Sequence, residues 1–321
     1  MNAQLEVRRL GQTEIQVTPI GLGVMQFSGG SGVFRMMFDE IPRVEMNQIV
    51  ASALAEGINW FDTAEMYGGG RSERALARGL EAAGRKDTDV IVCTKWFPMF
   101  RTAANIAKTI DVRLHNLNGF SIDHYIVHQP WGFSSPESEM DAMADLVAAG
   151  KVRSVGVSNF NVDQMRRTHA ALAKRGIPLA TNQVQYSLLE RGIEKNGVLQ
   201  AARELGISIV SWGPLASGLL TGKFHKDPDK LARTPIGRRT RLRGQIERTR
   251  PLIDVLDEMS QRYQVTISQV ALNWLVHFNG ETVLAIPGAS KVHQAKEAAD
   301  AMRLSLDAAD MARLDEVSRS I

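Results

Sequence analysis

The stretch Phe61-Asp62-Thr63-Ala64-Glu65-Met66-Tyr67 follows directly on the apolar segment Ile58-Asn59-Trp60. An apolar run that stops on a carboxylate, with a phenol soon after it, is typical of a buried strand whose end reaches a functional surface. Two later apolar runs stop in the same way, on Lys95 after Val90-Ile91-Val92-Cys93-Thr94 and on His128 after Ile122-Asp123-His124-Tyr125-Ile126-Val127. The pattern predicts a catalytic rim that carries a carboxylate, a phenol, an ammonium group and an imidazole.

Short apolar runs alternate with longer amphipathic segments along the chain. The runs predict eight strands, at 18–24, 58–61, 90–94, 122–127, 152–157, 180–185, 207–212 and 282–286. The segments between them have the period of helices, for example at 45–56, 72–83, 102–117, 135–149, 162–174 and 197–205. Several are followed by the glycine that often ends a helix in a left-handed conformation, namely Gly57, Gly84, Gly150, Gly176 and Gly206. The strands should be parallel, because antiparallel hairpins need no helix between them.

Eight strand-and-helix units predict a single α/β domain over residues 1–321, folded as a closed (β/α)8 TIM barrel. The main rival is an open doubly wound sheet, which normally carries Gly-x-Gly-x-x-Gly at its first turn from strand to helix. Here the first strand ends Gly21-Leu22-Gly23-Val24-Met25-Gln26, so the third glycine is missing. A pair of glycines alone does not decide between the two folds.

Two long connections interrupt the alternation, one near 25–44 and the other at 213–245. In a barrel, the connections that leave the carboxyl ends of strands form the active face. We therefore expect both to cover cofactor or substrate. Within the first, Met36 and Met37 are equally compatible with a pliable pocket and with loop packing. The arginine-rich run at 233–250 is expected to be a solvated face, because it lacks the interleaved aromatic residues of a nucleic-acid site.

Composition limits the class of protein further. The chain has 321 residues, 44% of them hydrophobic and 23% charged, which is enough to bury a large core. A net charge of +3 and a pI near 9.0 suit an anionic ligand without requiring nucleic acid. The single cysteine, Cys93, excludes an internal disulfide and is expected to be inert packing. With no signal pattern and no apolar stretch of membrane-spanning length, we expect a soluble, cytoplasmic protein with no membrane partner.

The four groups of the rim fit the transfer of one proton at a carbonyl or alcohol oxygen. A phenol has a pKa near 10 and needs a neighbouring cation to favour its anion. Lys95 would supply that charge for Tyr67, and Asp62 would keep the lysine protonated. His128 would orient and polarise a carbonyl through a hydrogen bond. None of the four groups can supply a hydride, so a cofactor must.

Structural roles are the alternative for each of these residues. Lys95 and Asp62 could form an ordinary ion pair, and a histidine at a strand end is often only a satisfied core residue. The gathering of all four groups favours the catalytic interpretation for His128. For His124, earlier in the same strand, we expect the structural role. No metal site is expected.

Motifs over essentially the whole chain resemble the aldo-keto reductase superfamily. In order they are Gly21-Leu22-Gly23, Phe61-Asp62-Thr63-Ala64 with Tyr67-Gly68, Thr94-Lys95, Val127-His128, Gly156-Val157-Ser158-Asn159-Phe160, Asn182-Gln183-Val184-Gln185-Tyr186, Pro214-Leu215-Ala216-Ser217-Gly218-Leu219-Leu220-Thr221-Gly222-Lys223 and Ile286-Pro287-Gly288-Ala289-Ser290. The resemblance implies a (β/α)8 barrel that binds NADPH without a Rossmann fold. The chain also looks like the branch of this superfamily found in cyanobacteria and chloroplasts, and more distantly like the β subunits of voltage-gated potassium channels.

The resemblance also implies roles for the rim. Tyr67 would be the proton donor, Lys95 and Asp62 the pair that tunes it, and His128 the group that orients the carbonyl. Trp212 stands where the family usually has a tyrosine stacked on the nicotinamide ring, and an indole can stack at least as well. The positions that match the contacts of the nicotinamide carboxamide are Ser158, Asn159 and Gln183.

For the rest of the cofactor, the resemblance assigns four further groups of positions. The loop around the pyrophosphate matches Gly213, Pro214, Leu215, Ser217, Gly218 and Lys223, and the cofactor seat also takes in Gly23, Val24, Met25, Asp62 and Gly288. Ser290, Lys291 and Gln294 match the grip on the adenosine 2′-phosphate, which favours NADPH/NADP+ over NADH. Glu297 matches the adenine side. Two residues depart from the family pattern, Ala298 in place of a frequent Asn and Gln129 in place of a frequent Trp.

Two classes of function remain. The first is an NADP(H)-dependent aldo-keto reductase that converts small aldehydes or ketones to alcohols. The second is a regulatory protein that keeps the cofactor site but acts through a partner, as the resemblance to the channel β subunits implies. The absence of a long N-terminal extension favours the enzyme. The sequence does not predict the particular carbonyl substrate or the oligomeric state.

Overall fold

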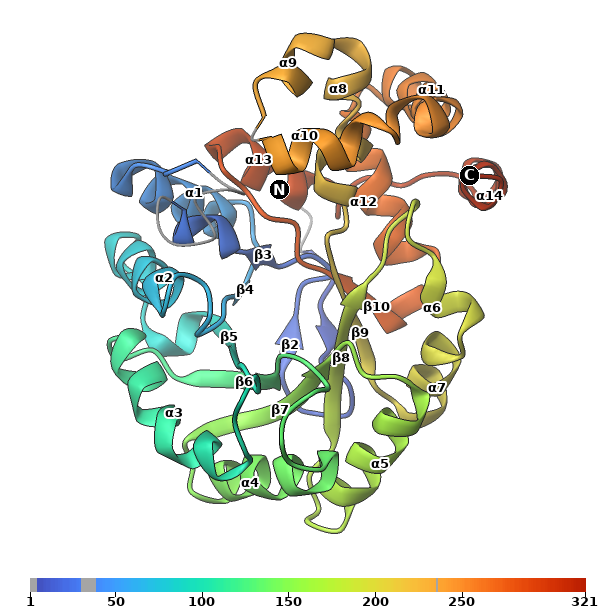
Figure 1. Ribbon diagram of the computed structural model, residues 1–321. Coiled ribbons are helices and arrows are strands. Elements are labelled where there is room, and N and C mark those ends of the chain that lie inside the picture. The colour runs from blue at the N-terminus through green and yellow to red at the C-terminus, as the bar shows by residue number, and fades with distance from the viewer. Residues whose placement is uncertain (1–4, 30–38, 235) are drawn as a thin grey trace.

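Eight parallel strands form one sheet, with helices around its outside (Figure 1). This computed structural model describes residues 5–29, 39–234 and 236–321, so the predicted cluster Arg35-Met36-Met37-Phe38 lies outside the described residues. Strand neighbours follow chain order from β3 to β10. The strands are β3 Leu22–Gly23, β4 Trp60–Asp62, β5 Ile91–Trp96, β6 Ile122–Val127, β7 Val152–Ser158, β8 Leu179–Gln185, β9 Ser208–Trp212 and β10 Val283–Ala285. All eight predicted strands are confirmed.

The first and last strands meet and close the sheet into a barrel. Parallel bridges join Ile20 to Ala285 and Gly23 to Gly288. The Gly21 amide donates to the Ala285 carbonyl at 2.9 Å, and the Gly23 amide donates to the Pro287 carbonyl at 3.0 Å. The predicted closed (β/α)8 barrel is therefore confirmed, and the open doubly wound sheet is excluded.

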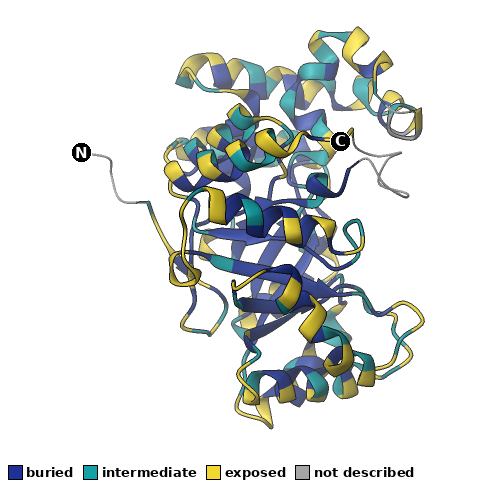
Figure 2. Cartoon of the chain, turned by 90° about the vertical axis from the view of Figure 1, so that its left-hand side faces the viewer, coloured by how far each residue is buried: buried dark blue, intermediate teal, exposed yellow. Residues whose placement is uncertain are grey.

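Helices follow most strands and cover the outside of the barrel, where Figure 2 shows their outer faces exposed around a buried sheet. Some of these helices begin at a side-chain cap, such as Asn161 before α5 and Thr266 before α12. The five glycines expected to end helices all have positive φ. The helices are α1 Arg43–Ala55, α2 Arg71–Ala82, α3 Ala104–Asn116, α4 Pro136–Ala148, α5 Val162–Ala173, α6 Gly192–Lys195, α7 Val198–Leu205, α8 Lys223–Lys226, α9 Pro228–Ala232, α10 Ile236–Arg243, α11 Ile246–Tyr263, α12 Ile267–His277, α13 Val292–Asp300 and α14 Ala308–Arg319.

Strand alternation sorts the side chains into an outer layer under the helices and an inner layer. In β5, Val92 and Trp96 join the large core between sheet and helices, whereas Cys93 lies in the small core inside the barrel. Burial raises the pKa of the Cys93 thiol well above its usual value, which agrees with inert packing. Lys95 follows on the inner side at the carboxyl end of the same strand.

His124 occupies the inner layer below the rim. Its two ring nitrogens lie 2.8 Å from Ser154 Oγ and 2.7 Å from Thr181 Oγ1, and burial lowers its pKa to about 3. A side chain at Gly156 would come within 2.6 Å of His124 Nε2, so the neighbouring strand must carry a glycine there. The structural role expected for His124 agrees with these contacts.

An antiparallel hairpin of β1 (Arg8–Arg9) and β2 (Gln16–Val17) precedes the barrel. Leu10, Ile15 and Val17 pack into the inner core of the barrel. The buried Arg8 guanidinium donates to the carbonyls of Val276 and Val283 at 2.7 and 3.0 Å. Because two-residue strands carry no periodic signal, the sequence did not predict this hairpin.

The connection at 213–245 is largely helical in the described residues, rather than an irregular loop. It contains the 3-10 turn η4 (Ala216–Thr221) followed by α8, α9 and α10. These helices lie at the top of the view in Figure 1. Leu219, Phe224, Leu231 and Leu242 form a separate small core, which explains why this segment is ordered as helices. No helix of the described part of the chain combines the length and apolarity that a membrane span requires.

Glu139 in the first turn of α4 is a buried carboxyl group of unusual pKa. It is 2% exposed, and its Oε1 atom has no hydrogen-bond partner among the described residues. Burial raises its pKa from 4.5 to about 7. Because the folded pKa lies above the unfolded one, its contribution to stability is complete below pH 4.5 and is lost as the pH rises through about 7.

We expect Glu139→Gln to increase the free energy of unfolding at pH 8 and to flatten its dependence on pH between 5 and 8. The upper limit from the change in pKa is on the order of 3 kcal/mol. Urea denaturation across this pH range measures the effect. Glu137→Gln is the matched control, because hydrogen bonds from Arg167 lower the Glu137 pKa to about 2 and place its titration below the range. Equal pH dependence in wild type and Glu139→Gln would contradict the prediction.

Candidate active site

A buried ion pair between Lys95 and Asp62 lies at the carboxyl end of the barrel strands. Lys95 is 0% exposed and Asp62 is 2% exposed. Lys95 Nζ donates to Asp62 Oδ1 at 2.5 Å and to the Thr63 carbonyl at 2.8 Å. The other carboxylate oxygen accepts a hydrogen bond from Gln183 Nε2 in β8 at 2.9 Å. The pair thus connects β4, β5 and β8 inside the barrel.

Lys95 stays positively charged although its side chain is buried. Desolvation acts to lower the pKa of the ammonium group, but the charge of Asp62 and its hydrogen bond to the lysine raise it, and the net change is upward. The ammonium group therefore remains protonated at neutral pH. It is a fixed positive charge in a water-poor site.

Tyr67 lies in the turn after β4 and faces this charge, with Lys95 Nζ 5.2 Å from the centre of its ring. Burial raises the pKa of the phenol, while Lys95 acts in the opposite direction and Asp62 adds to the rise. The sequence suggested a phenol made more acidic by the lysine. In the structure the lysine does lower the pKa, but burial outweighs it, so Tyr67 holds its proton at neutral pH.

His128 completes the group of four. Its ring meets that of Tyr67 edge-on at 5.6 Å between centres. Burial, with a smaller effect of the Lys95 charge, lowers the pKa of His128 well below 6.5, so the imidazole is neutral. Its Nδ1 atom has no hydrogen-bond partner among the described residues. The structure therefore brings together a protonated phenol, an ammonium group, its carboxylate partner and a neutral imidazole.

Polar side chains on the next strands extend this rim. Ser158 Oγ donates to the Gln183 carbonyl at 2.8 Å. Asn159, whose φ of 63° is left-handed, accepts a hydrogen bond from Trp212 Nε1 at 3.0 Å and donates to Gln129 Oε1 at 3.3 Å. All three positions matched to the carboxamide contacts, and Trp212, thus lie in one network. Gln129, a departure from the family pattern, is part of the same network.

The segment after β9 has a backbone suited to close approach by a phosphate chain. Three successive residues have positive φ, at 46° for Ala216, 56° for Ser217 and 90° for Gly218. The amides of Ala216 and Gly218 donate within the segment, to the carbonyls of Gly213 and Leu215 at 2.9 and 2.8 Å. Lys223 begins α8 directly after this turn. Of the remaining residues of this set, Gly213 has positive φ, Pro214 is buried, and Leu215 packs against the main core.

The closing seam of the barrel supplies another part of the expected cofactor seat. Gly23 and Gly288 pair across it, and the Val24 amide donates to the Asp62 carbonyl at 2.9 Å before η1 (Met25–Ser28) begins. A side chain at Gly288 would come within 2.0 Å of Gln26 Nε2, so the Gln26 amide would have to move to admit one. Gln26 Oε1 is buried without a hydrogen-bond partner among the described residues. An unsatisfied polar atom of this kind fits a seat for a polar ligand.

The residues matched to the 2′-phosphate gather at the start of α13. Gln294 Oε1 accepts hydrogen bonds from the amides of Ser290 and Lys291 at 2.8 and 3.3 Å. Lys291 Nζ forms an ion pair with Glu45 of α1 at 3.0 Å. Burial raises the pKa of Glu297, one turn further along the helix. A phosphate bound at this helix start would replace Gln294 Oε1 as the acceptor of the two amides and Glu45 as the partner of Lys291.

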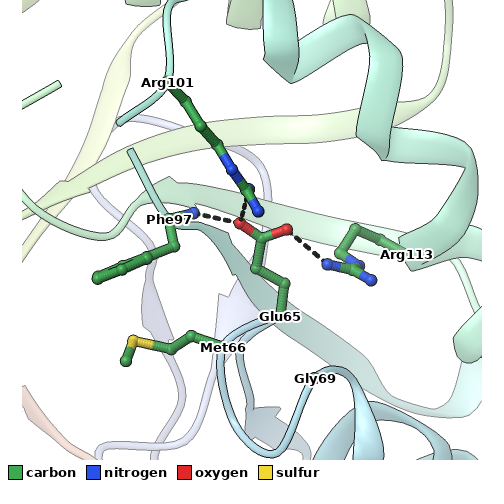
Figure 3. Close-up of a pocket in the computed structure, with 6 residues that line it drawn as sticks. All are labelled: Glu65, Met66, Gly69, Phe97, Arg101 and Arg113. Carbon is green, nitrogen blue, oxygen red and sulfur yellow. Dashed lines mark hydrogen bonds and ion pairs between the residues drawn. The ribbon is translucent and has the colours of Figure 1, made fainter. Parts of the chain in front are cut away.

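A cavity of about 300 Å³ lies beside the rim (Figure 3). One of its walls is Phe97, whose ring meets that of His128 edge-on at 5.8 Å. The cavity residues are Glu65, Met66, Gly69, Phe97, Arg101 and Arg113. The sequence patterns assigned no role to any of them, although Glu65 belongs to the stretch that first indicated the site.

The fold is an eight-stranded parallel barrel with a buried polar rim, and comparison with known proteins identifies the family. The aldo/keto reductase family model matches residues 19–319. A chloroplastic pyridoxal reductase of Arabidopsis thaliana is 32% identical over 298 residues, covering 88% of this chain and 78% of the relative. An NADP(+) aldo-keto reductase of Schizosaccharomyces pombe is 30% identical over 288 residues, covering 85% and 82%.

A solved structure agrees with these matches. A glycerol dehydrogenase of Gluconobacter oxydans superposes with a TM-score of 0.78 at 25% identity, covering 99% of this chain and 95% of that one. The chain belongs to the aldo/keto reductase family and is an oxidoreductase. The resemblance seen in the sequence is confirmed.

The buried ion pair makes a prediction about stability. Lys95→Met leaves the Asp62 carboxylate buried without its counter-charge, so the free energy of unfolding should fall by about 3–5 kcal/mol. The double variant Lys95→Met/Asp62→Asn removes both charges and keeps an acceptor for Gln183, and it should recover most of that loss. Urea denaturation measures all three proteins. Equal stability of the single and double variants would show that the pair is not the source of the loss.

Proposed function

We propose that this protein is an NADPH-dependent reductase that converts small aldehydes or ketones to alcohols, with Tyr67 as the proton donor. The observation that carries the proposal is the protonated phenol of Tyr67 facing the buried Lys95 ammonium group. The position of a neutral His128 beside the phenol supports it further. In this proposal the segments near 25–44 and 213–245 cover the cofactor and the substrate of a single barrel domain.

The reduction adds a hydride to the carbonyl carbon and a proton to the carbonyl oxygen. When bound, the nicotinamide supplies the hydride that these side chains lack. Tyr67 gives its hydroxyl proton to the carbonyl oxygen and becomes a phenolate. The Lys95 ammonium group stabilises that phenolate, and Asp62 keeps the ammonium group in place.

His128 orients the substrate in this mechanism. A neutral imidazole carries one N–H group, which can donate to the carbonyl oxygen before charge develops there. Burial of the imidazole strengthens such a hydrogen bond, because little water competes for it. Two donors, the phenol and the imidazole, would then hold the oxygen that receives the proton.

The residues of the cofactor seat support a dinucleotide that carries a 2′-phosphate. Ser158, Asn159 and Gln183 would hold the carboxamide, and Trp212, fixed by its hydrogen bond to Asn159, would stack on the nicotinamide. The turn at 216–218 would wrap the pyrophosphate. Lys291 and the amides at the start of α13 would take the 2′-phosphate, in agreement with the NADP(+) named for the fission yeast relative.

Replacing Tyr67 by Phe tests the proposed proton donor. Turnover should fall by roughly 10²–10⁴-fold, because the ring remains but the transferable proton is lost. Oxidation of NADPH at 340 nm is followed with short aliphatic aldehydes, aromatic aldehydes and pyridoxal, and fluorescence titration measures NADPH binding, which should not change. Tyr263→Phe, at a phenol that bonds Asp310 far from the rim, is the matched control and should keep full activity. Undiminished turnover in Tyr67→Phe would refute the mechanism.

Cofactor selection is tested at Lys291. Lys291→Ala should weaken NADPH binding by roughly tenfold or more while NADH binding stays nearly constant, because only NADPH carries the 2′-phosphate. Lys296→Ala is the control on the same helix, since Lys296 pairs with Glu56 and is not assigned to the cofactor. Isothermal titration with both cofactors gives the affinities. Equal losses for NADPH and NADH would remove Lys291 from the phosphate site.

A further inference from the structure

Glu65 joins the turn that carries Tyr67 to the strand that carries Lys95. It is buried, at 6% exposure, and precedes Tyr67 by two residues. Its amide donates to the Lys95 carbonyl at 3.2 Å. Its Oε1 atom accepts a hydrogen bond from the amide of Phe97 at 2.6 Å. Glu65 is therefore hydrogen-bonded to this part of the chain at two points. Its main-chain amide bonds Lys95 in β5, and its side chain bonds Phe97, which directly follows β5.

Two arginines hold the carboxylate of Glu65 in this position (Figure 3). Arg101 donates to Oε1 and Arg113, from α3, donates to Oε2, each at 2.6 Å. Arg113 is itself fixed by Glu73, with Nε 3.1 Å from Oε2 of that residue. Three donors on one buried carboxylate leave it little freedom to move.

The turn that contains Tyr67 is closed by the same residue. The Gly70 amide donates to the Glu65 carbonyl at 2.8 Å, so Tyr67 lies within a loop whose base is Glu65. On the other side, Phe97 contacts the ring of His128. A shift of Glu65 would thus move Tyr67 relative to Lys95, and Phe97 relative to His128.

We propose that Glu65 is a positioning residue that holds the Tyr67 phenol at its working distance from the Lys95 ammonium group. The expected effect of Glu65 on turnover rests on the proposed reductase function, whereas its expected effect on the pKa of Tyr67 does not. The charge–charge interaction falls with distance, so a loosened turn weakens the interaction that lowers the phenol pKa. The charged and titratable groups around Tyr67 are Lys95, Asp62 and His128.

Whether the pKa of Tyr67 rises or falls in Glu65→Gln distinguishes a positioning role of Glu65 from a direct effect of its negative charge. Removing the negative charge of Glu65 would, at fixed geometry, make the phenol more acidic. Losing the alignment with Lys95 makes a phenol whose ring stays buried less acidic. Glu65→Gln should therefore raise the pKa of Tyr67, which is the opposite of what the lost charge alone produces.

Asp123 offers a matched control at the other end of the same strands. Its carboxylate is buried and accepts hydrogen bonds from the Val92 amide of β5 at 2.8 Å and from Arg153 at 2.5 Å. Like Glu65, Asp123 accepts hydrogen bonds from one main-chain amide and from an arginine, but it lies at the end of the strands opposite to the rim. Asp123→Asn should lower stability without changing Tyr67.

The experiment labels the four tyrosines with 3-fluorotyrosine, whose phenol is more acidic, and follows their titration by ¹⁹F NMR. Tyr67→Phe assigns the Tyr67 resonance. In Glu65→Gln the pKa of Tyr67 should rise by roughly half a unit or more, and it should not change in Asp123→Asn. In unlabelled protein, kcat for carbonyl reduction should fall by roughly 10–100-fold in Glu65→Gln, with little change in the KM for NADPH.

Arg101→Gln is the milder variant should Glu65→Gln fail to fold, because Arg101 is 36% exposed and supplies only one of the three donors. It should change the Tyr67 pKa and kcat in the same direction, by less. An unchanged or lowered Tyr67 pKa in the folded variant overturns the proposal, even if activity falls. A raised pKa in protein that reduces no carbonyl compound would instead support the positioning role and refute the proposed function.

Discussion

An ammonium group sealed inside a protein needs a counter-charge, and the way Lys95 obtains one organises the whole rim. Desolvation of an isolated charge would cost many kcal/mol, so the lysine stays charged only because Asp62 lies against it. Asp62 in turn requires a second donor, which Gln183 provides from across the barrel. The ion pair and this hydrogen bond thereby connect the strands β4, β5 and β8. Tyr67 and His128 lie beside this positive charge, but burial is the main reason why the phenol keeps its proton and the imidazole is neutral.

The sequence was informative wherever side-chain period and chain order determine position. Because the carboxyl ends of parallel barrel strands form one face, the positions of Asp62, Lys95 and His128 at the ends of successive apolar runs were enough to predict a shared rim. Strand alternation separated Cys93 from Thr94. Strand ends shifted by only a few residues, as for β3, where the run 18–24 contains just two residues with regular strand pairing.

What could not be predicted depends on contacts between distant parts of the chain. Glu65 meets Arg101 and Arg113, which lie 36 and 48 residues away, and nothing in their spacing indicates that they meet. The pKa of Tyr67 is set by how deeply the ring is buried, a quantity that depends on its neighbours in space. Short strands such as β1 and β2 fell below the length at which alternation can be detected. The helices at 223–243 are held by a small core of their own rather than by the barrel.

The seam between β3 and β10 gives the fold a particular order of assembly. It joins residues 20–23 to residues 285–288, so nearly the whole chain must be in place before these hydrogen bonds can form. Pairings so distant along the chain gain their energy late in folding, after the cost of closing the loop has been met. Residues proposed for the cofactor lie on both sides of this seam, at Gly23 and Gly288. A dinucleotide bound there would favour the closed barrel by mass action, so that the ligand needed for the chemistry also completes the fold.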